Sequence, residues 1–219
     1  MKRFISITVF FLLTSLWPCP DVLAGDKTRA PNKLIQLRPG SADRWLTDGR
    51  YVVTPNAAEV NRDLRAAQQG DASAQFKMGQ RYDLGVGVRQ SYTESVKWLR
   101  RAAVQGNADA QYNLACMYNG GLGVPQDFGE AFQWFRKAAE QGNASAQKNL
   151  GAMYGSGKGV AQNPTEAYVW SSIATMSGNK EALNNRDYAA STLPPEDLGP
   201  AQNRAIKLFG EIQQRIEDT

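Results

Sequence analysis

Residues 110–144 read AQYNLACMYNGGLGVPQDFGEAFQWFRKAAEQGNA, and the main features of this stretch recur every 36 residues on both sides of it. Each unit holds an alanine, a tyrosine, the two glycines of a G-x-G turn and a tryptophan at fixed positions. These positions are Ala74, Ala110 and Ala146; Tyr82, Tyr118 and Tyr154; Gly85, Gly121 and Gly157; Gly87, Gly123 and Gly159; and Trp98, Trp134 and Trp170. A constant period of this length predicts an array of stacked units rather than one closed globule.

Each unit has the start and stop residues of two helices. Asp71, Asn107 and Asn143 precede the first helix, and Ser91, Asp127 and Asn163 precede the second. Their side-chain oxygens can accept hydrogen bonds from free backbone N–H groups, and a glutamate three residues after each member of the second set predicts a capping box. A glycine ends each helix. Because the next N-cap follows directly, we expect consecutive helices to pack antiparallel.

Small residues alternate with large ones at helical spacing. Gly79, Ala115 and Gly151 stand on the first helices, and Ala102, Ala138 and Ala174 stand on the second. Close helix crossings require small side chains with large apolar ones between them. The pattern therefore predicts tightly interdigitated helix pairs.

The stretch GSGKG at 155–159 resembles part of a phosphate-binding loop. Such a loop needs G-x-x-x-x-G-K-[ST], but here the leading position is Ala152 and the hydroxyl position is Gly159. The stretch also occupies the repeat position of GVGV at 85–88 and GLGV at 121–124. We therefore interpret it as a turn between helices.

These signals divide the chain into consecutive segments. We predict a signal peptide over 1–24, an N-terminal extension or linker over 25–56, a repeat solenoid over 57–192 and a C-terminal capping helix over 193–219. Within the solenoid we place a half repeat at 57–70, full repeats at 71–106, 107–142 and 143–178, and an extra helix at 179–192. The final helix has an apolar stripe formed by Leu198, Ala201, Ala205, Leu208, Ile212 and Ile216.

The N-terminus has the layout of an export signal. Lys2 and Arg3 precede an apolar run of about 14 residues, shorter than the roughly 20 that span a bilayer. Val22-Leu23-Ala24 follows, and cleavage after Ala24 fits the rule that a small residue precedes the cleavage point. We expect cleavage near Ala24, a periplasmic or secreted location and no membrane span in the mature chain. Within 25–56, the segment YVVT is at most a short strand.

Composition excludes several functional classes. Residues 51–219 carry equal numbers of acidic and basic side chains, so the globular part offers no basic surface for nucleic acid. The sequence has no histidine, which removes the usual general base and the commonest metal ligand. We expect no cofactor and no metal. After loss of residues 1–24, Cys116 would be the only cysteine, so we expect a mature chain without an internal disulfide.

The quoted stretch resembles a Sel-one-like repeat, a 36-residue relative of the tetratricopeptide repeat. The elements A-x-x-x-L-[GA]-x-x-Y, G-x-G-V and [AS]-x-x-W recur in order from about Ala66 to Gly178. The resemblance implies an all-α, right-handed α-solenoid of antiparallel helix pairs whose first helices line a concave face. It also implies a non-catalytic adaptor. Its partner would be a protein such as a sensor kinase or a component of envelope assembly.

Three sets of residues could suggest chemistry. Glu94, Glu130 and Glu166 form a carboxylate row, but each lies in the first turn of a helix, where a negative charge is stabilising. The three tryptophans share one repeat position, which indicates core rather than a sugar-binding platform. We interpret Cys116 as a small core thiol, because the sequence offers no histidine to activate it.

Polar residues without a packing role are the better candidates. Lys77, Asn113 and Asn149 share one repeat position, which faces the groove by similarity to tetratricopeptide repeats. Asparagine amides there could hold the backbone of an extended peptide. Gln80, Arg81 and Tyr112 are neighbours, and Lys77 or Arg81 could pair with an acidic side chain or a C-terminal carboxylate.

We therefore expect a monomeric, exported adaptor or regulator that binds a protein or peptide partner in its concave groove and has no catalytic residues. Two alternatives from other classes stay open. One is an envelope hydrolase or small-molecule binder that uses the carboxylate row. The other is a structural component of an envelope or polysaccharide-export complex.

Overall fold

The structure of the protein is a computed structural model, and it describes residues 44–47, 50–53 and 57–218. The predicted signal peptide and most of the predicted N-terminal extension lie outside the described residues. Strands β1 (Arg44–Thr47) and β2 (Arg50–Val53) pair antiparallel, with Arg44 opposite Val53. The second strand includes most of the YVVT segment in which a short strand was predicted.

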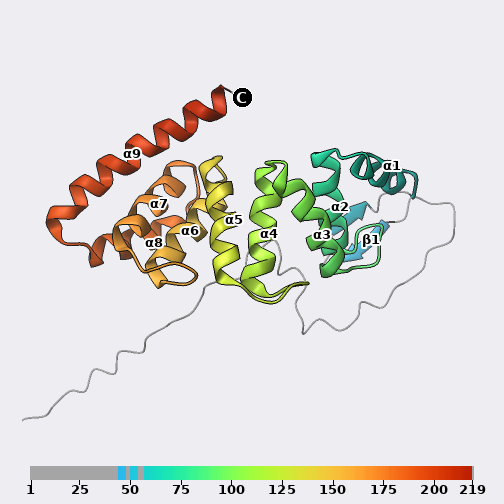
Figure 1. The fold of residues 1–219 in the computed structure, drawn as a ribbon, viewed down its shortest axis with the longest axis horizontal. Helices are drawn as coiled ribbons and strands as arrows, with labels where there is room; N and C mark the ends of the chain where they lie inside the picture. Colours follow the sequence, from blue (N-terminus) through green and yellow to red (C-terminus); the bar gives the residue numbers. More distant parts are fainter. Residues whose placement is uncertain (1–43, 48–49, 54–56, 219) are drawn as a thin grey trace, which may run out of the picture.

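Helices make up the rest of the described chain and form an elongated row (Figure 1). Three antiparallel pairs stand side by side, which confirms the predicted all-α solenoid. They are α2 (Ala72–Leu84) with α3 (Tyr92–Val104), α4 (Ala108–Gly120) with α5 (Phe128–Glu140), and α6 (Ala144–Ser156) with α7 (Pro164–Met176). Helix α1 (Ala57–Gln68) precedes them, and α8 (Ala182–Thr192) and α9 (Pro195–Glu217) follow.

The predicted N-caps are confirmed in all three pairs. Side-chain oxygens of Asp71, Asn107 and Asn143 accept from the backbone N–H three residues later, at 2.6, 2.8 and 2.9 Å. Ser91, Asp127 and Asn163 do the same for the second helices, at 3.3, 3.0 and 3.1 Å. The reciprocal half of the capping box is absent at these three sites. The N–H of each second-helix cap donates instead to a tyrosine carbonyl, that of Tyr82, Tyr118 or Tyr154.

The G-x-G segments are turns, including the one at 155–159. Gly85, Gly121 and Gly157 have φ values of 72°, 65° and 71°, the left-handed conformation that ends a helix. A Cβ on Gly123 or Gly159 would overlap the backbone of the preceding unit, at Tyr92 or at Phe128. The second glycine therefore permits one unit to lie directly against the last, which is a packing role rather than phosphate binding.

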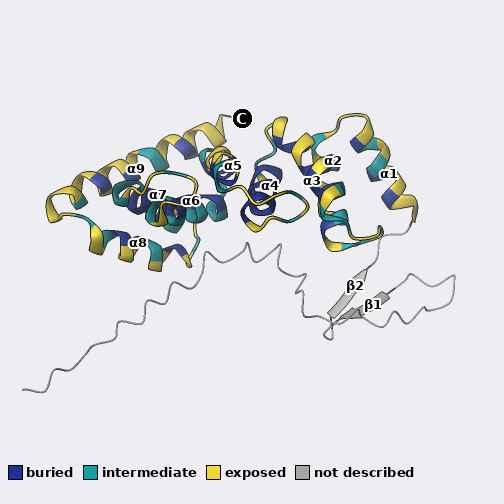
Figure 2. Ribbon diagram, turned by 60° about the horizontal axis from the view of Figure 1, so that its bottom comes forward, coloured by how far each residue is buried: buried dark blue, intermediate teal, exposed yellow. Residues whose placement is uncertain are grey.

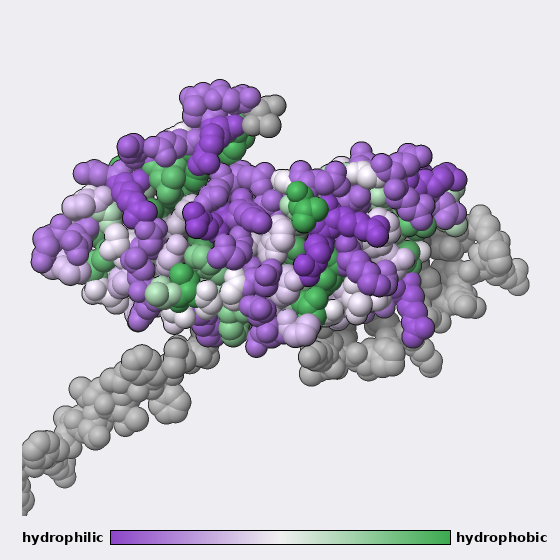
Figure 3. Space-filling model, in the orientation of Figure 1, coloured by the Kyte–Doolittle hydropathy of each residue, from purple (hydrophilic) through white to green (hydrophobic). Residues whose placement is uncertain are grey.

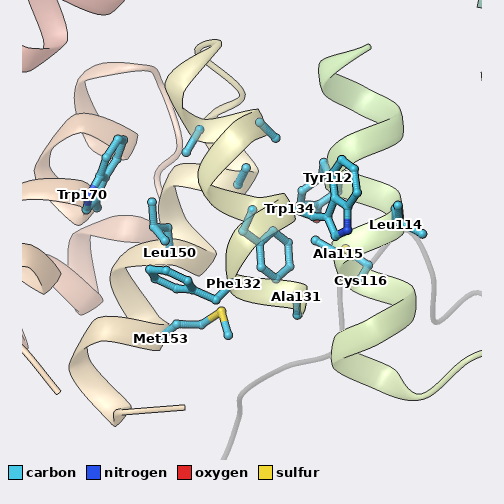
Figure 4. Packing of buried hydrophobic residues seen from close by; sticks show 14 of the residues in the cluster. Tyr112, Leu114, Ala115, Cys116, Ala131, Phe132, Trp134, Leu150, Met153 and Trp170 are labelled. Atoms are coloured by element: carbon cyan, nitrogen blue, oxygen red, sulfur yellow. The ribbon is translucent and has the colours of Figure 1, made fainter. Parts of the chain in front are cut away.

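A continuous apolar core runs between the helices. Figure 4 shows Phe132 of α5 pointing toward Leu150 and Met153 of α6. Small residues mark the close crossings, as predicted. A Cβ on Gly79 would lie 2.7 Å from Leu99, and one on Gly151 would lie 2.5 Å from Ser171 Oγ. Larger side chains at these two positions would force the paired helices apart.

Buried glutamines connect neighbouring helices of the array. Gln75, Gln111 and Gln147 each donate to a backbone carbonyl of the preceding second-type helix, at 3.0–3.1 Å. Gln105 and Gln141 then donate to the Oε1 atoms of Gln75 and Gln111, each at 2.7 Å. In the third pair Ser177 occupies the position of Gln105 and Gln141, so Gln147 Oε1 and Ser177 Oγ are buried without partners.

Helix α9 runs diagonally across α7 (Figure 1). The outer face of α7 is suited to this contact, because Val169, Ser172 and Ile173 stand where α3 carries Lys97, Arg100 and Arg101. On α9, Ala201, Ala205 and Ile212 are buried, and Arg204 pairs with Glu166 of α7 at 2.6 Å. The predicted final helix thus covers the last complete pair.

Helix α8 ends the row with polar residues. Arg186 and Asp187 stand at the repeat positions of Leu150 and Gly151, which are buried in α6. Figure 2 shows much of α8 and the outer side of α9 as exposed, whereas α4 to α7 are largely buried where they meet. A second helix could not pack on α8 as α7 packs on α6 without burying charge at these positions, because Gly151 contacts α7 directly.

Candidate partner-binding surface

The first helices present a row of polar residues at intervals of 36. Lys77 on α2 is exposed, and Asn113 on α4 and Asn149 on α6 are half-buried. Asn185 on α8 is also half-buried and continues the same interval; the sequence-based prediction missed it, although the offset would have found it. We call Lys77, Asn113, Asn149 and Asn185 the Lys/Asn row.

The first helices also contact one another between units, α2 with α4 and α6 with α8. In a curved stack of helix pairs, the row whose members approach each other most closely lies on the inner side. The four members of the Lys/Asn row lie on these successive first helices, at one repeat position.

Arg81 does not belong to the free surface. Its guanidinium lies 2.7 Å from Asp63 Oδ2 and 3.4 Å from Glu59 Oε1, and its side chain is only 11% exposed. The prediction that Arg81 is available for an acidic partner is corrected by this ion pair. The pairing could not be read from the sequence, because Arg81 and Asp63 lie 18 positions apart on different helices.

Tyr112 is a second correction. It is 5% exposed, and its ring centroid lies 5.8 Å from that of Phe135. One helical position, about 100° of rotation, separates Tyr112 from Asn113. That rotation turns the ring into the α4–α5 interface, so Tyr112 belongs to the core rather than to a binding surface.

An open pocket of about 300 Å³ lies between α1 and α2. Its walls carry charges of both signs, an amide and two aliphatic side chains. The lining residues are Glu59, Arg62, Asp63, Lys77, Gln80, Arg81, Leu84 and Val86. Lys77, Gln80 and Arg81 were predicted as partner-binding residues, and the structure brings these three together in one pocket.

The pocket replaces an apolar contact seen elsewhere in the array. Arg81 stands at the repeat position of Met117 and Met153, and Asp63 stands at that of Leu99 and Phe135. Those four apolar residues are 0–1% exposed. Two of the positions that form the core in later units therefore hold an ion pair at the α1–α2 interface.

The glutamates of the carboxylate row each have a structural partner. Glu94 Oε1 lies 2.6 Å from Lys97 Nζ, Glu130 Oε2 accepts from Trp134 Nε1 at 3.1 Å, and Glu166 pairs with Arg204. The tryptophans are 6–8% exposed, and no group of acidic residues or cysteines in the described ranges could hold a metal ion. Each of these three carboxylates therefore has a structural contact of its own.

Cys116 is buried, at 2% exposed, as expected. The structure shows it disulfide-bonded, and the bonded partner lies outside the described residues. The prediction of a core thiol concerned the chain after loss of residues 1–24, and it stays a prediction.

Among the carboxyl groups of the described residues, Asp83 is the one whose pKa burial raises most. Its side chain lies in the last turn of α2, and desolvation raises its pKa from 3.8 to about 6. The pKa of Tyr92 is also raised, first by burial and then by the charge of Asp83. Asn119 and Gly155 occupy the same position in the next units, so the ionisable group is particular to the first pair.

No helix in the described part of the chain combines the length and apolarity needed to cross a bilayer. Figure 3 shows one face of the molecule, which is mostly hydrophilic with small apolar patches.

The Sel1 repeat model matches residues 72–107, 108–143 and 144–179. The fold is similar to that of a Sel1 repeat protein from Oxalobacter formigenes, at 38% identity and a TM-score of 0.55, over 58% of this chain and 96% of the other. It is also similar to a protective antigen of uropathogenic Escherichia coli with an SLR fold, at 30% identity and a TM-score of 0.66, over 76% of this chain. The chain spans only 37% of that antigen's length. No protein with a curated description matches the sequence significantly.

Proposed function

Because the chain belongs to the Sel1 repeat family, we propose that it is a non-catalytic module that binds a partner protein or peptide along its first helices. Helical repeat arrays of this kind commonly act as scaffolds for protein–protein interaction. The observation that carries the proposal for this chain is the Lys/Asn row, which presents polar side chains on four successive first helices.

The spacing of the row suits an extended peptide. Packed helices lie roughly 8–10 Å apart. An extended chain rises about 3.3 Å per residue, so every third residue or so would meet a new helix. The amide of each asparagine can donate to a peptide carbonyl and accept from a peptide N–H. Such contacts would hold the ligand backbone while leaving its sequence free to be selected elsewhere.

The test is a double change of Asn113 and Asn149 to alanine. We expect the variant to keep its helical circular dichroism spectrum and to lose at least about 90% of partner capture by cross-linking, because two amides each contributing ~1 kcal/mol are removed. Asn203→Ala on the exposed surface of α9 is the matched control and should capture normally. Full capture by the folded double variant would refute the assignment of the site.

We also propose that the protein works outside the cytoplasm, as a periplasmic or secreted adaptor or regulator in the cell envelope. The support is the charged, apolar and small-residue pattern of residues 1–24. N-terminal sequencing of the protein from the envelope or medium fraction should begin near Gly25. Recovery only from the cytosol, with Met1 retained, would contradict this.

A further inference from the structure

We propose that the α1–α2 pocket binds one carboxylate group of the peptide that lies along the Lys/Asn row, with Lys77 as the cation that recognises it. The inference rests on the proposed function and adds the chemistry of one end of the site. It is argued from the charges in the pocket, from its position on the row and from its size.

The pocket contains three cations, and two of them are already occupied. Arg81 is held between Asp63 and Glu59, and Arg62 lies 3.9 Å from Asp63. Lys77 is exposed and forms no ion pair with any described residue. An ammonium group in a recess attracts an anion, and the amide of Gln80 one turn away can donate a second hydrogen bond.

The buried ion pair also fixes the walls of the recess. In later units the equivalent positions hold Met117 with Leu99 and Met153 with Phe135, all fully buried. Asp63 and Arg81 instead place an ion pair in the lining of the pocket, which Lys77 also lines. Glu59 and Asp63 on α1 add negative charge to this lining, which disfavours a ligand group carrying two negative charges.

Position and size identify the ligand group further. Lys77 is the first member of the Lys/Asn row, so a peptide that lies along Asn113 and Asn149 would end at or pass over the pocket. A volume of about 300 Å³ with Leu84 and Val86 in its lining fits one side chain or one terminal residue. The ligand is therefore a peptide with a terminal carboxylate or a single aspartate or glutamate at this point.

The experiment uses a random octapeptide library without acidic residues, synthesised with a free carboxyl terminus or a C-terminal amide. A third pool is amidated and carries one aspartate at a varied position. Bound peptides are identified by mass spectrometry for the full chain and for Lys77→Gln, Lys77→Arg and Asn113→Ala with Asn149→Ala. Lys97→Gln is the matched control, because Lys97 lies on α3 and pairs with Glu94.

We expect the unchanged chain to enrich one carboxylate pool about tenfold over the neutral amide pool, as for a charge-assisted hydrogen bond. Lys77→Gln should abolish that preference, whereas Lys77→Arg and Lys97→Gln should keep it. Which carboxylate pool is enriched distinguishes a terminal from a side-chain group. Equal enrichment of all pools, or a preference that survives in Lys77→Gln, would overturn the inference while leaving peptide binding intact. Failure to bind any pool, with a folded chain, would overturn the proposed function as well.

Discussion

Arg81 and Asp63 show how single residues change the character of a repeated interface. The same two positions are apolar in the next two units, and the side chains of the ion pair are 11% and 9% exposed. A buried pair of this kind contributes little net stability, but removing one partner leaves an uncompensated charge. The two residues therefore depend strongly on each other.

A double-mutant cycle tests this dependence. We expect Arg81→Met to destabilise the fold by about 3 kcal/mol, because Asp63 would be buried without its main partner. Asp63→Leu should cost a similar amount or less, since Glu59 remains near Arg81 at 3.4 Å. The double variant, which copies Met117 and Leu99, should recover to within about 1 kcal/mol of the unchanged chain. Additive losses in chemical denaturation would contradict the coupling.

Asp83 should give the first helix pair a pH-dependent stability. Its folded pKa of about 6 lies above its unfolded value of 3.8, so the folded chain binds the extra proton between these values. Stability from this group is therefore present below about pH 4 and is lost as pH rises to about 6. Asp83→Asn should remove this slope and stabilise the fold above pH 6 by about 1 kcal/mol, after allowance for solvent screening.

The control for that prediction is internal to the repeat. Asn119 already holds the amide at the equivalent position of the second pair, so Asp83→Asn introduces a side chain that the fold accepts. Thermal melts of both proteins at pH 4, 5, 6 and 7 measure the difference. A difference that stays constant across this range would show that Asp83 titrates normally.

At the scale of helices, the missing glutamine bridge marks the third pair. Gln147 Oε1 and Ser177 Oγ are buried and unpaired, whereas Gln105 and Gln141 complete the bridge in the first two pairs. We expect Ser177→Gln to stabilise the fold by about 1 kcal/mol, through one recovered hydrogen bond. The mirror change, Gln141→Ser, should destabilise it by a similar amount. Denaturant titration of both variants measures these two changes in stability. A gain in both variants, or a loss in both, would be inconsistent with the bridge.

The docking of α9 on α7 gives a second prediction at this scale. Ala205 is 1% exposed in the contact, and its neighbour Ile206 is 55% exposed. Ala205→Glu should cost at least about 2 kcal/mol, because it places a charge in an apolar contact. Ile206→Glu is the matched control and should change stability by less than about 0.5 kcal/mol. Equal melting temperatures for the two variants would mean that α9 does not pack as described.

The sequence predicted most helix boundaries because they depend on local hydrogen bonds. Each N-cap bonds to a residue three positions on, and the repeat shows each cap several times. The reciprocal capping by Glu94, Glu130 and Glu166 was wrong, since the backbone N–H groups at those caps bond to tyrosine carbonyls nine residues earlier. Of the predicted binding residues, Lys77 and Gln80 are exposed in the structure. The side chains of Arg81 and Tyr112 are largely covered, because each contacts a residue of another helix.

At the scale of the whole molecule, stability should vary along the row. Each helix pair in such an array packs only against its neighbours, so end helices have one partner. Helix α1 packs on α2, whereas α9 spans α7 and reaches the turn at Gly142, where a Cβ would lie 2.5 Å from Ile216. The two ends are therefore unequally supported.

Hydrogen exchange tests this asymmetry. We expect the slowest amide exchange in α4 to α7 and exchange in α1 faster by at least about tenfold, because opening α1 disrupts one interface. Mass spectrometry of peptides from each helix provides the measurement, and α3 and α5 serve as internal references. Slower exchange in α1 than in α5 would contradict a stability set by neighbouring contacts.

The sequence alone determined that this chain is a stack of helix pairs. The caps, turn glycines and small crossing residues of each 36-residue unit act through contacts between residues that are close in the sequence. The tertiary structure decided which side chains remain available. It placed Arg81 against Asp63, turned Tyr112 into the core and laid α9 across the apolar outer face of α7. These outcomes depend on contacts between helices that are distant in sequence, where the partner of each charge or ring is fixed only by packing.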